Sequence, residues 1–145
     1  MKTLIVGTGI IGVVYGWALA QSGNDVTHFV RKGRKDQFKD GIQLDLLDER
    51  KGHTKYNMTK YAVKCVEEVS PADGYELIMV PTSMHQTEDS LKALVPVSGN
   101  AIFLTLSGNW DGTDFIDQLL PRERYLMGYG DAGGTVRSDG VYWTN

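Results

Sequence analysis

Short apolar runs alternate with segments of helical periodicity along most of the chain. Leu4-Ile5-Val6 is the first apolar run, and it leads through a glycine-rich stretch into a helix-forming segment that ends near Gln21. The same alternation predicts strands at 26–30, 76–80, 101–106 and 125–129, and helices at 83–94 and 111–120. Strands that alternate with helices are typical of an α/β fold with a doubly wound, mostly parallel sheet.

The middle and the end of the chain follow a different pattern. Residues 41–44 and 61–66 are predicted to be extended, the second with period-two alternation of apolar and polar positions. Residues 140–145 predict one more strand, which carries Tyr142 and Trp143. Two large aromatic side chains there predict contact with a further domain or with a second copy in a homodimer. We therefore expect some extra strands in the middle and at the C-terminal end of the chain.

The first strand is joined to the first helix by Gly7-Thr8-Gly9-Ile10-Ile11-Gly12, a G-x-G-x-x-G sequence. Turns that bind nothing also contain such glycines, but a strand before them, a helix after them and a second strand indicate the dinucleotide-binding unit of Rossmann-type folds. Gly7 permits the tight turn, Gly9 lets a pyrophosphate approach the backbone, and Gly12 lets the helix pack on the strand. Free N–H groups at the helix N-terminus favour the anion. All six residues are candidates for cofactor binding.

A basic run, Arg31-Lys32-Gly33-Arg34-Lys35, follows the second strand. NAD-binding proteins usually carry an acidic residue at this point for the ribose 2′-hydroxyl, so arginine favours the 2′-phosphate of NADP. Arg31 and Arg34 are the better candidates, because a planar guanidinium matches a phosphate bidentately. Asp25 at the start of the strand and Asp36 beyond the run are not placed to compete. The alternative is a solvated basic loop, which the glycines upstream disfavour.

Four points on the chain, including Gly7 and Arg31, share one edge of the predicted sheet. Parallel strands joined by crossover helices bind ligands beyond the carboxyl ends of the strands. Those ends fall at Gly7, Arg31, Pro81 and Ser107. We therefore expect the cofactor to lie along this edge, with Val80 and Pro81 beside it.

Composition narrows the partners and the compartment. The 145 residues carry a formal net charge of -3 at pH 7, and no basic face beyond 31–35 predicts a nucleic-acid partner. No apolar run has the length of a membrane span, and no signal peptide is expected before the first strand. The single cysteine, Cys65, excludes an internal disulfide and is expected to be a reduced structural thiol. The sequence predicts one cytoplasmic domain, residues 1–145.

Other polar residues are better explained as structural. Aspartates recur every third residue in the predicted helix at 111–120, but no histidine or cysteine lies near Asp111, Asp114 and Asp117 in the sequence to complete a metal site. His85 falls in the first turn of a surface helix, where histidine is usually solvated, and His28 falls on the second strand. No residue of the chain is a convincing proton donor for catalysis.

Later segments make the chain similar to a known family. Besides the glycines and Arg31, these are Gly41-Ile42-Gln43-Leu44, Gln86-Thr87-Glu88 opening a helix, Leu104-Thr105-Leu106 before a Gly/Asn turn, and residues 128–134. In this order they resemble the N-terminal NADP-binding domain of ketopantoate reductases (2-dehydropantoate 2-reductases), over essentially the whole chain. The resemblance implies NADPH-dependent reduction of a 2-keto acid to a 2-hydroxy acid, as in pantothenate biosynthesis. It also implies Gln86 and Asn109 as cofactor contacts.

The chain departs from this family at two positions and in its extent. Ser83 stands where the family usually has lysine, and Gly108 where it usually has asparagine, which here is the next residue, Asn109. Asn109 is a weak catalytic candidate, and an asparagine that only satisfies a turn explains it equally well. The family's helical C-terminal domain supplies the general-acid lysine, and the chain has no counterpart of it. We therefore expect residues 1–145 to be inactive alone.

Three functions are open at this point. The first is the NADPH-binding domain of a ketopantoate-reductase-like oxidoreductase whose partners are NADPH and a small 2-keto acid. The second is a reductase of the same class with another substrate, because Val80-Pro81-Thr82-Ser83 is also similar to the corresponding segment of glycerol-3-phosphate dehydrogenases. The third is a non-catalytic NADP-binding sensor, which the lack of a convincing general acid favours.

Overall fold

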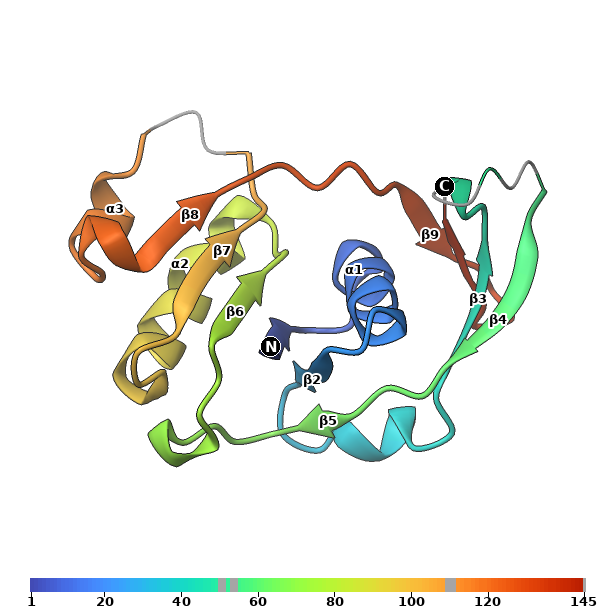
Figure 1. The fold of residues 1–145 in the computed structure, drawn as a ribbon, viewed down its shortest axis with the longest axis horizontal. Helices are drawn as coiled ribbons and strands as arrows, with labels where there is room; N and C mark the ends of the chain where they lie inside the picture. Colours follow the sequence, from blue (N-terminus) through green and yellow to red (C-terminus); the bar gives the residue numbers. More distant parts are fainter. Residues whose placement is uncertain (50–51, 53–54, 109–111, 145) are drawn as a thin grey trace.

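The computed structural model describes residues 1–49, 52, 55–108 and 112–144. Two sheets are arranged on either side of helix α1 (Ile10–Gln21), as Figure 1 shows. The larger sheet has the order β5-β2-β1-β6-β7-β8, and its neighbouring strands run parallel. Its strands are β1 (Lys2–Val6), β2 (Asp25–Phe29), β5 (Cys65–Val66), β6 (Leu77–Val80), β7 (Ile102–Thr105) and β8 (Tyr125–Met127).

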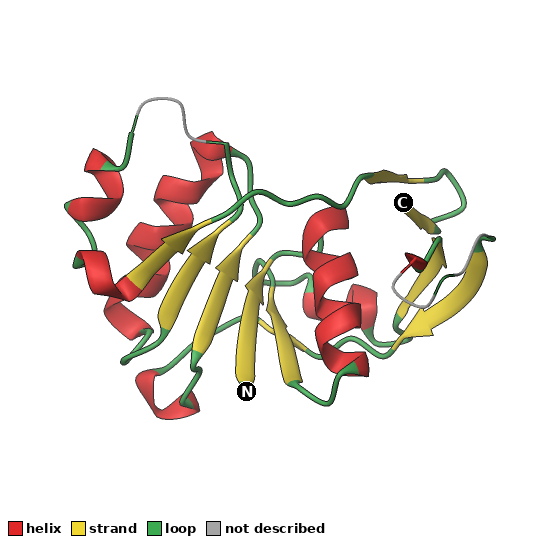
Figure 2. Ribbon diagram, turned by 45° about the horizontal axis from the view of Figure 1, so that its top comes forward, coloured by secondary structure: helices red, strands yellow, loops and turns green. Residues whose placement is uncertain are grey.

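The strand order reverses at β1, which pairs with β2 on one side and with β6 on the other. Helices cover both faces of this sheet (Figure 2): α1 lies on one, and α2 (Met84–Leu94) and α3 (Asp114–Asp117) lie on the other. A crevice beyond the carboxyl ends of the strands is expected where the order reverses, and this position is where such folds bind ligands.

Successive side chains of β1 point to opposite faces and enter different cores. Leu4 packs with Ile78, Phe103 and Leu91 beneath α2, and Ile5 packs beneath α1. Both side chains are fully buried. The β1 strand is thus buried on both faces, as is usual for a central strand of a parallel sheet, and the turn that follows it starts from a rigid position.

The smaller sheet has the order β4-β3-β10-β9 and combines antiparallel and parallel pairs. Its strands are β3 (Ile42–Leu46), β4 (Asn57–Tyr61), β9 (Gly134–Val136) and β10 (Tyr142–Thr144). Val13 and Trp17 of α1 pack against Ile42 and Leu44 of this sheet. Helix α1 is therefore enclosed between two sheets, which explains why it is apolar almost all round.

The predicted fold class is confirmed, including the extra strands in the middle and at the C-terminal end. The single strand predicted at 61–66 is wrong. The chain turns after Tyr61, where the Val63 N–H donates to the Tyr61 carbonyl oxygen at 2.9 Å, and β5 begins only at Cys65. Strands of different sheets meet at this turn, and each is half-buried, so the period-two alternation runs through both.

Two other predicted elements are shorter in the structure. The helix expected at 111–120 is present as α3, and Asp111 lies outside the described residues. The predicted length came from the helical spacing of the apolar residues Phe115, Ile116, Leu119 and Leu120. A single helical turn followed by a non-helical turn buries Ile116 and Leu120 equally well, so the helix ends earlier. The strand expected at 125–129 ends at Met127, and β9 was not predicted. No helix within the described ranges has the length and apolar character needed to cross a membrane.

Candidate functional site

The glycine-rich turn connects β1 to α1 at the carboxyl edge of the larger sheet. Gly7 has φ +80°, a left-handed conformation that favours glycine, and its N–H donates to the Phe29 carbonyl oxygen at 2.8 Å. Gly9 is the N-cap of α1, where no side chain caps the helix and no acidic residue lies in the first turn. The first N–H groups of α1 are therefore left for an external anion.

Gly9 and Gly12 have different surroundings, which agree with different tasks. A Cβ added to Gly9 would meet no atom of the described residues within 4 Å, whereas one on Gly12 would lie 3.1 Å from Ile5 Cγ2 and 3.1 Å from Pro81 Cγ. Gly12 lets α1 pack closely on β1 and on the loop after β6. Gly9 faces open space, as a backbone that a pyrophosphate approaches must do.

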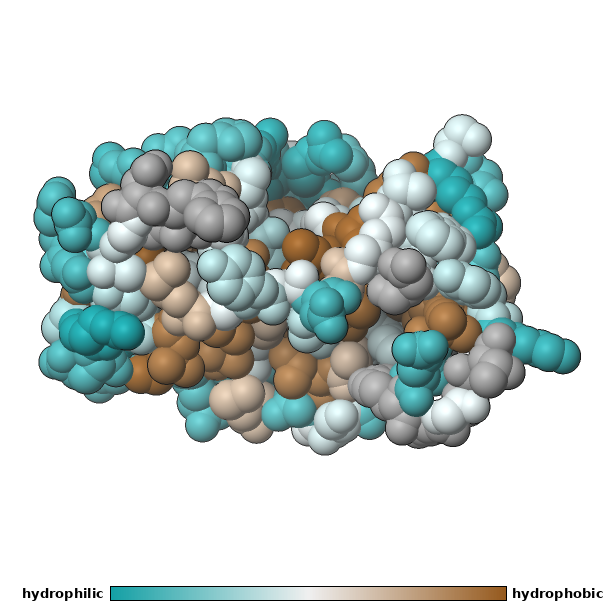
Figure 3. Space-filling view, turned by 90° about the horizontal axis from the view of Figure 1, so that it is seen from above, coloured by the Kyte–Doolittle hydropathy of each residue, from teal (hydrophilic) through white to brown (hydrophobic). Residues whose placement is uncertain are grey.

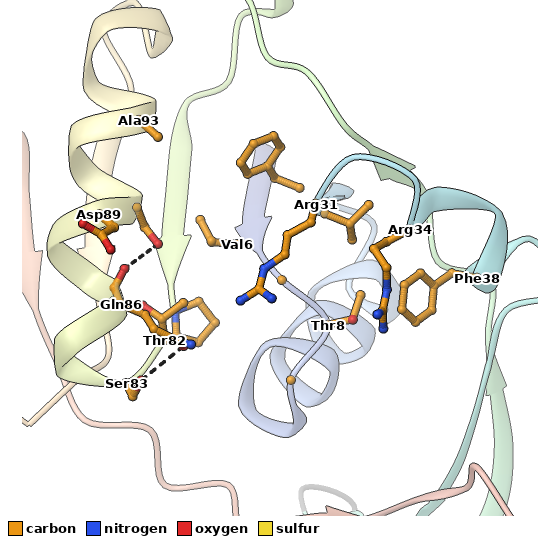
Figure 4. A pocket seen from close by; sticks show the side chains of 16 residues that line it. Val6, Thr8, Arg31, Arg34, Phe38, Thr82, Ser83, Gln86, Asp89 and Ala93 are labelled. Atoms are coloured by element: carbon orange, nitrogen blue, oxygen red, sulfur yellow. Dashed lines mark hydrogen bonds between the residues drawn. The ribbon is translucent and has the colours of Figure 1, made fainter.

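A cavity of about 660 Å³ opens beside this turn. It lies between the turn, the loop after β2 and helix α2, as Figure 4 shows. Its lining residues are Val6, Gly7, Thr8, Gly9, Phe29, Val30, Arg31, Arg34, Phe38, Pro81, Thr82, Ser83, Gln86, Asp89, Ser90 and Ala93. Such a volume is within the range of small-molecule and cofactor sites.

Arg31 and Arg34 line the cavity on the β2 side, and both are exposed. Arg31 extends from the end of β2 toward the space between the glycine-rich turn and α2, and Arg34 lies beside Phe38 (Figure 4). Within the described part of the chain, neither guanidinium has a carboxylate within ion-pair distance. Asp25, at the other end of β2, pairs with Lys64 at 2.6 Å. The two guanidinium groups are therefore available to an anionic ligand.

Glu67, which follows β5, holds the loop that carries these arginines. Its Oε1 accepts the Lys35 N–H at 2.9 Å. The backbone N–H groups of Lys35, Gly33 and Arg34 hold the pKa of Glu67 below its ordinary value. The Glu67 carboxylate accepts hydrogen bonds from these N–H groups, and it thereby fixes the backbone between Arg31 and η1 (Lys35–Phe38).

On the other side of the cavity, hydroxyl groups join the ends of β6 and β7 to α2. The fully buried Thr87 hydroxyl lies 3.1 Å from the Ser83 carbonyl oxygen and 3.3 Å from the Ser107 hydroxyl. Ser83, the N-cap of α2, donates its hydroxyl to Gln86 Oε1 at 3.1 Å. These contacts hold Ser83 and Gln86 at the edge of the cavity, where Figure 4 shows them.

The structure brings most of the predicted cofactor residues to one cavity. Those that line it are Gly7, Thr8, Gly9, Arg31, Arg34, Pro81 and Gln86. The others lie beside it: Val80 is fully buried at the end of β6, Ile10 and Ile11 are partly buried in the first turn of α1, and Gly12 packs on β1. Asn109 lies outside the described residues, so its predicted role stays a prediction.

The apolar residues of the cavity lining and most of those from α2 were not predicted from the sequence. Phe29, Val30 and Phe38 supply apolar surface, and α2 contributes Asp89 and Ala93 besides Gln86. A signal for the α2 residues exists in the sequence. Positions 83, 86, 89/90 and 93 recur at intervals of three to four, and they therefore form one face of the helix that follows β6.

The described residues that were interpreted as structural do not line the cavity. Burial raises the pKa of the Cys65 thiol to about 11, so the thiol is unreactive. Asp117 accepts hydrogen bonds from the Tyr125 hydroxyl at 2.5 Å and the Thr113 hydroxyl at 2.9 Å. His85 is exposed. Among the described residues, no three histidine, cysteine or acidic side chains form a group that could hold a metal ion.

Several large apolar side chains are exposed, on both sheets. Figure 3 shows brown patches between polar ones on the face seen from above. Leu126 on β8 is 57% exposed, Tyr129 just after it 76%, and Met58 on β4 59%. The large aromatics of β10 are engaged within the chain, since Trp143 stacks on Tyr56 with ring centroids 5.6 Å apart. The contact with another domain or subunit stays a prediction.

Comparison of the chain with known proteins identifies its family. A family profile described as ketopantoate reductase PanE/ApbA matches residues 3–145. The chain belongs to the ketopantoate reductase family. It is 30% identical over 113 residues to a 2-dehydropantoate 2-reductase of Aquifex aeolicus (strain VF5), a match that covers 77% of this chain and 33% of the relative. The predicted family is thereby confirmed.

Solved structures agree with this fold. D-mandelate dehydrogenase in a ternary complex with NADH and anilino(oxo)acetate matches with a TM-score of 0.78 at 23% identity, over 100% of this chain and 46% of that one. The 2-dehydropantoate 2-reductase of Methylococcus capsulatus matches with a TM-score of 0.76 at 19% identity, again over 100% and 46%. The chain thus spans a third to a half of the length of these relatives.

Proposed function

We propose that residues 1–145 form the NADPH-binding part of an oxidoreductase that reduces a 2-keto acid to a 2-hydroxy acid. The observation that carries the proposal is the pair of exposed arginines that line the cavity beside a glycine-rich turn whose Gly9 faces open space. The family membership adds the reaction class, since the Aquifex aeolicus relative is a 2-dehydropantoate 2-reductase.

The residues of the cavity fit the cofactor part by part. The N–H groups of the glycine-rich turn and of the start of α1 would hold the pyrophosphate, and Arg31 with Arg34 would hold the 2′-phosphate. Phe29 and Val30 offer apolar surface between these two groups of polar residues. When bound, NADPH supplies the hydride for carbonyl reduction. The protein's own residues bind and orient the cofactor along the strand edge.

The preference for NADPH over NADH rests on charge. A mandelate dehydrogenase with a similar fold was solved with NADH, but at 23% identity the likeness concerns the fold alone. The loop after β2 holds two exposed guanidinium groups, and among the described residues no carboxylate lines the cavity on that side. A charge-assisted hydrogen bond is worth about 1.5–3 kcal/mol, so one arginine favours the 2′-phosphate by about 10- to 100-fold.

The direct test is a titration of the chain with NADPH and with NADH, followed by the fluorescence of the reduced nicotinamide. We expect NADPH to bind at least about tenfold more tightly than NADH. Equal affinities would remove the 2′-phosphate assignment, and no binding of either would remove the cofactor assignment.

The substrate is tested on a fusion of this chain to the C-terminal half of the Aquifex aeolicus relative. NADPH oxidation is followed with ketopantoate and a panel of other 2-keto acids. Turnover of another acid but not of ketopantoate would indicate that Ser83 and Gly108 change the substrate specificity, because the family usually has lysine and asparagine at these positions. NADPH binding without turnover of any acid would favour the non-catalytic sensor.

A further inference from the structure

The Gly7 carbonyl of the glycine-rich turn is held by a buried histidine that the cofactor site does not use. His28 on β2 is fully buried, and its Nδ1 lies 2.7 Å from the Gly7 carbonyl oxygen. A carbonyl oxygen can only accept, so Nδ1 carries the proton and Nε2 is the acceptor. The Tyr61 hydroxyl, 3.2 Å from Nε2, donates to it. Tyr61, His28 and Gly7 therefore form a directed chain of hydrogen bonds.

Gly16 provides the space for this chain of hydrogen bonds. A Cβ at position 16 would lie 2.6 Å from His28 Nε2 and 3.0 Å from the Tyr61 hydroxyl. Glycine inside a helix costs about 1 kcal/mol relative to alanine. The glycine in the second turn of α1 is thus explained by the imidazole and hydroxyl that pack against it.

The next carbonyls of the turn are held in the same way. The Tyr142 hydroxyl of β10 donates to the Thr8 carbonyl oxygen at 3.0 Å. The Gly9 carbonyl oxygen accepts the Val13 N–H at 2.9 Å, within α1. Three consecutive carbonyls therefore have fixed partners, from β2, from the smaller sheet and from α1.

Fixed carbonyls determine where the N–H groups point. In a trans peptide the C=O and the following N–H point in opposite directions, and the chain has no cis peptide among its described residues. Holding the Gly7 carbonyl against His28 directs the Thr8 N–H away from the core. Holding the Thr8 carbonyl against Tyr142 likewise directs the Gly9 N–H. Thr8 and Gly9 both line the cavity.

We propose that His28 and Tyr142 are positioning residues that fix the peptide planes of the glycine-rich turn, so that the Thr8 and Gly9 N–H groups are directed to bind the pyrophosphate. The inference rests on the proposed dinucleotide site and adds to it the residues that preorganise it. Neither side chain is among the residues that line the cavity. The two residues therefore affect one part of the cofactor selectively. The N–H groups that bind the pyrophosphate depend on both residues, whereas the guanidinium groups that bind the adenosine 2′-phosphate do not.

The first experiment compares NADPH with adenosine 2′-monophosphate, which has the 2′-phosphate but no pyrophosphate. Loss of one neutral hydrogen bond corresponds to a change of about 2- to 12-fold, so we expect Tyr142→Phe to weaken NADPH binding about fivefold. Its affinity for adenosine 2′-monophosphate, measured by NMR titration, should stay as in the wild type. The matched control is Tyr75→Phe, which removes the hydroxyl of a buried tyrosine just before β6 and should leave both affinities unchanged.

The second experiment uses two variants of His28 and one of Tyr61. His28→Leu removes the donor and should weaken NADPH binding about tenfold or more. His28→Asn places an N–H donor at the same number of bonds from the backbone as Nδ1, and should recover most of that loss. Tyr61→Phe keeps the bond from Nδ1 to Gly7, so it should lower thermal stability with little change in NADPH affinity.

A third measurement does not depend on ligand or on variants. The ¹⁵N spectrum of the wild-type imidazole should show a protonated Nδ1 and an unprotonated Nε2 at pH 7. The opposite tautomer would overturn the inference, as would equal losses for NADPH and adenosine 2′-monophosphate in the variants. If the wild type binds NADPH and NADH equally, only the 2′-phosphate assignment fails, because both carry the pyrophosphate. If it binds neither, the proposed function and this inference fail together.

Discussion

Replacing Gly9 with alanine separates binding from folding more sharply than any other single change in the turn. Gly9 has φ -71° and ψ 166°, an extended conformation that alanine adopts without strain. A Cβ there would have no atom within 4 Å in the part of the chain that the structure describes. We therefore expect the free energy of unfolding of Gly9→Ala to stay within about 0.5 kcal/mol of the wild type.

The expected loss in binding follows from the same geometry. The added methyl group occupies the open space from which a pyrophosphate approaches the N–H groups of the turn. Charge-assisted hydrogen bonds contribute about 1.5–3 kcal/mol, so the dissociation constants of both NADPH and NADH should rise by about 10- to 100-fold. Both cofactors are affected because both carry the pyrophosphate.

Gly7→Ala is the matched control. Gly7 also has no atom within 4 Å of an added Cβ, but its φ is +80°. A left-handed alanine costs about 1–2 kcal/mol, which should lower the Tm by roughly 3–8 °C. Unfolding is followed by circular dichroism and binding by nicotinamide fluorescence. A Gly9→Ala protein that is as stable as the wild type and binds NADPH equally well would refute the placement of the pyrophosphate.

Three other changes test the surroundings of the site. Glu67→Gln replaces the carboxylate that holds the loop after β2 with a neutral amide, which is a weaker acceptor. The affinity for NADPH should therefore fall about 2- to 10-fold, and the affinity for NADH should stay unchanged. Glu68→Gln, at an exposed position, should change neither affinity. Gly16→Ala should destabilise the fold by about 1–3 kcal/mol in urea unfolding, because the Cβ would lie 2.6 Å from His28 Nε2; a more stable protein would contradict the packing. Burial lowers the pKa of His28 below its ordinary 6.5, although the Gly7 carbonyl acts in the opposite direction. The unfolded chain therefore gains a proton below about pH 6.5 that the folded chain excludes, so stability falls as the pH drops. Tyr61 and Cys65, which face His28, have pKa values raised by burial and stay protonated in this range. The stability advantage of the wild type over His28→Asn should thus shrink between pH 7.5 and pH 5.5, and a constant difference would show that His28 does not titrate there.

The parts of the fold with strong periodicity could be predicted from the sequence. The strand before Gly7, the helix after it and the basic run after β2 are local features, and a parallel sheet brings the carboxyl ends of its strands to one edge whatever the details. The cavity next to Gly7, Arg31 and Pro81 follows from that topology. These residues were found because each is adjacent in sequence to the end of a strand.

The rest depends on contacts between segments far apart in the sequence. Nothing near Tyr61 indicates that the chain changes sheet there, since the alternation continues to β5. His28 is one polar residue on a buried strand, and only the approach of Tyr61 and the space left by Gly16 reveal its partners. Tyr142 reaches Thr8 across 134 positions. Local patterns carry no information about such pairings.

The central claim is that Arg31 makes this dinucleotide site an NADPH site. The most direct test is to measure the dissociation constants of NADPH and NADH for the wild type and for Arg31→Ala under the same ionic strength. We predict that Arg31→Ala weakens NADPH binding about 10- to 100-fold and NADH binding less than about twofold, so that the preference for NADPH is lost. Equal losses for the two cofactors, or an unchanged preference, would contradict it.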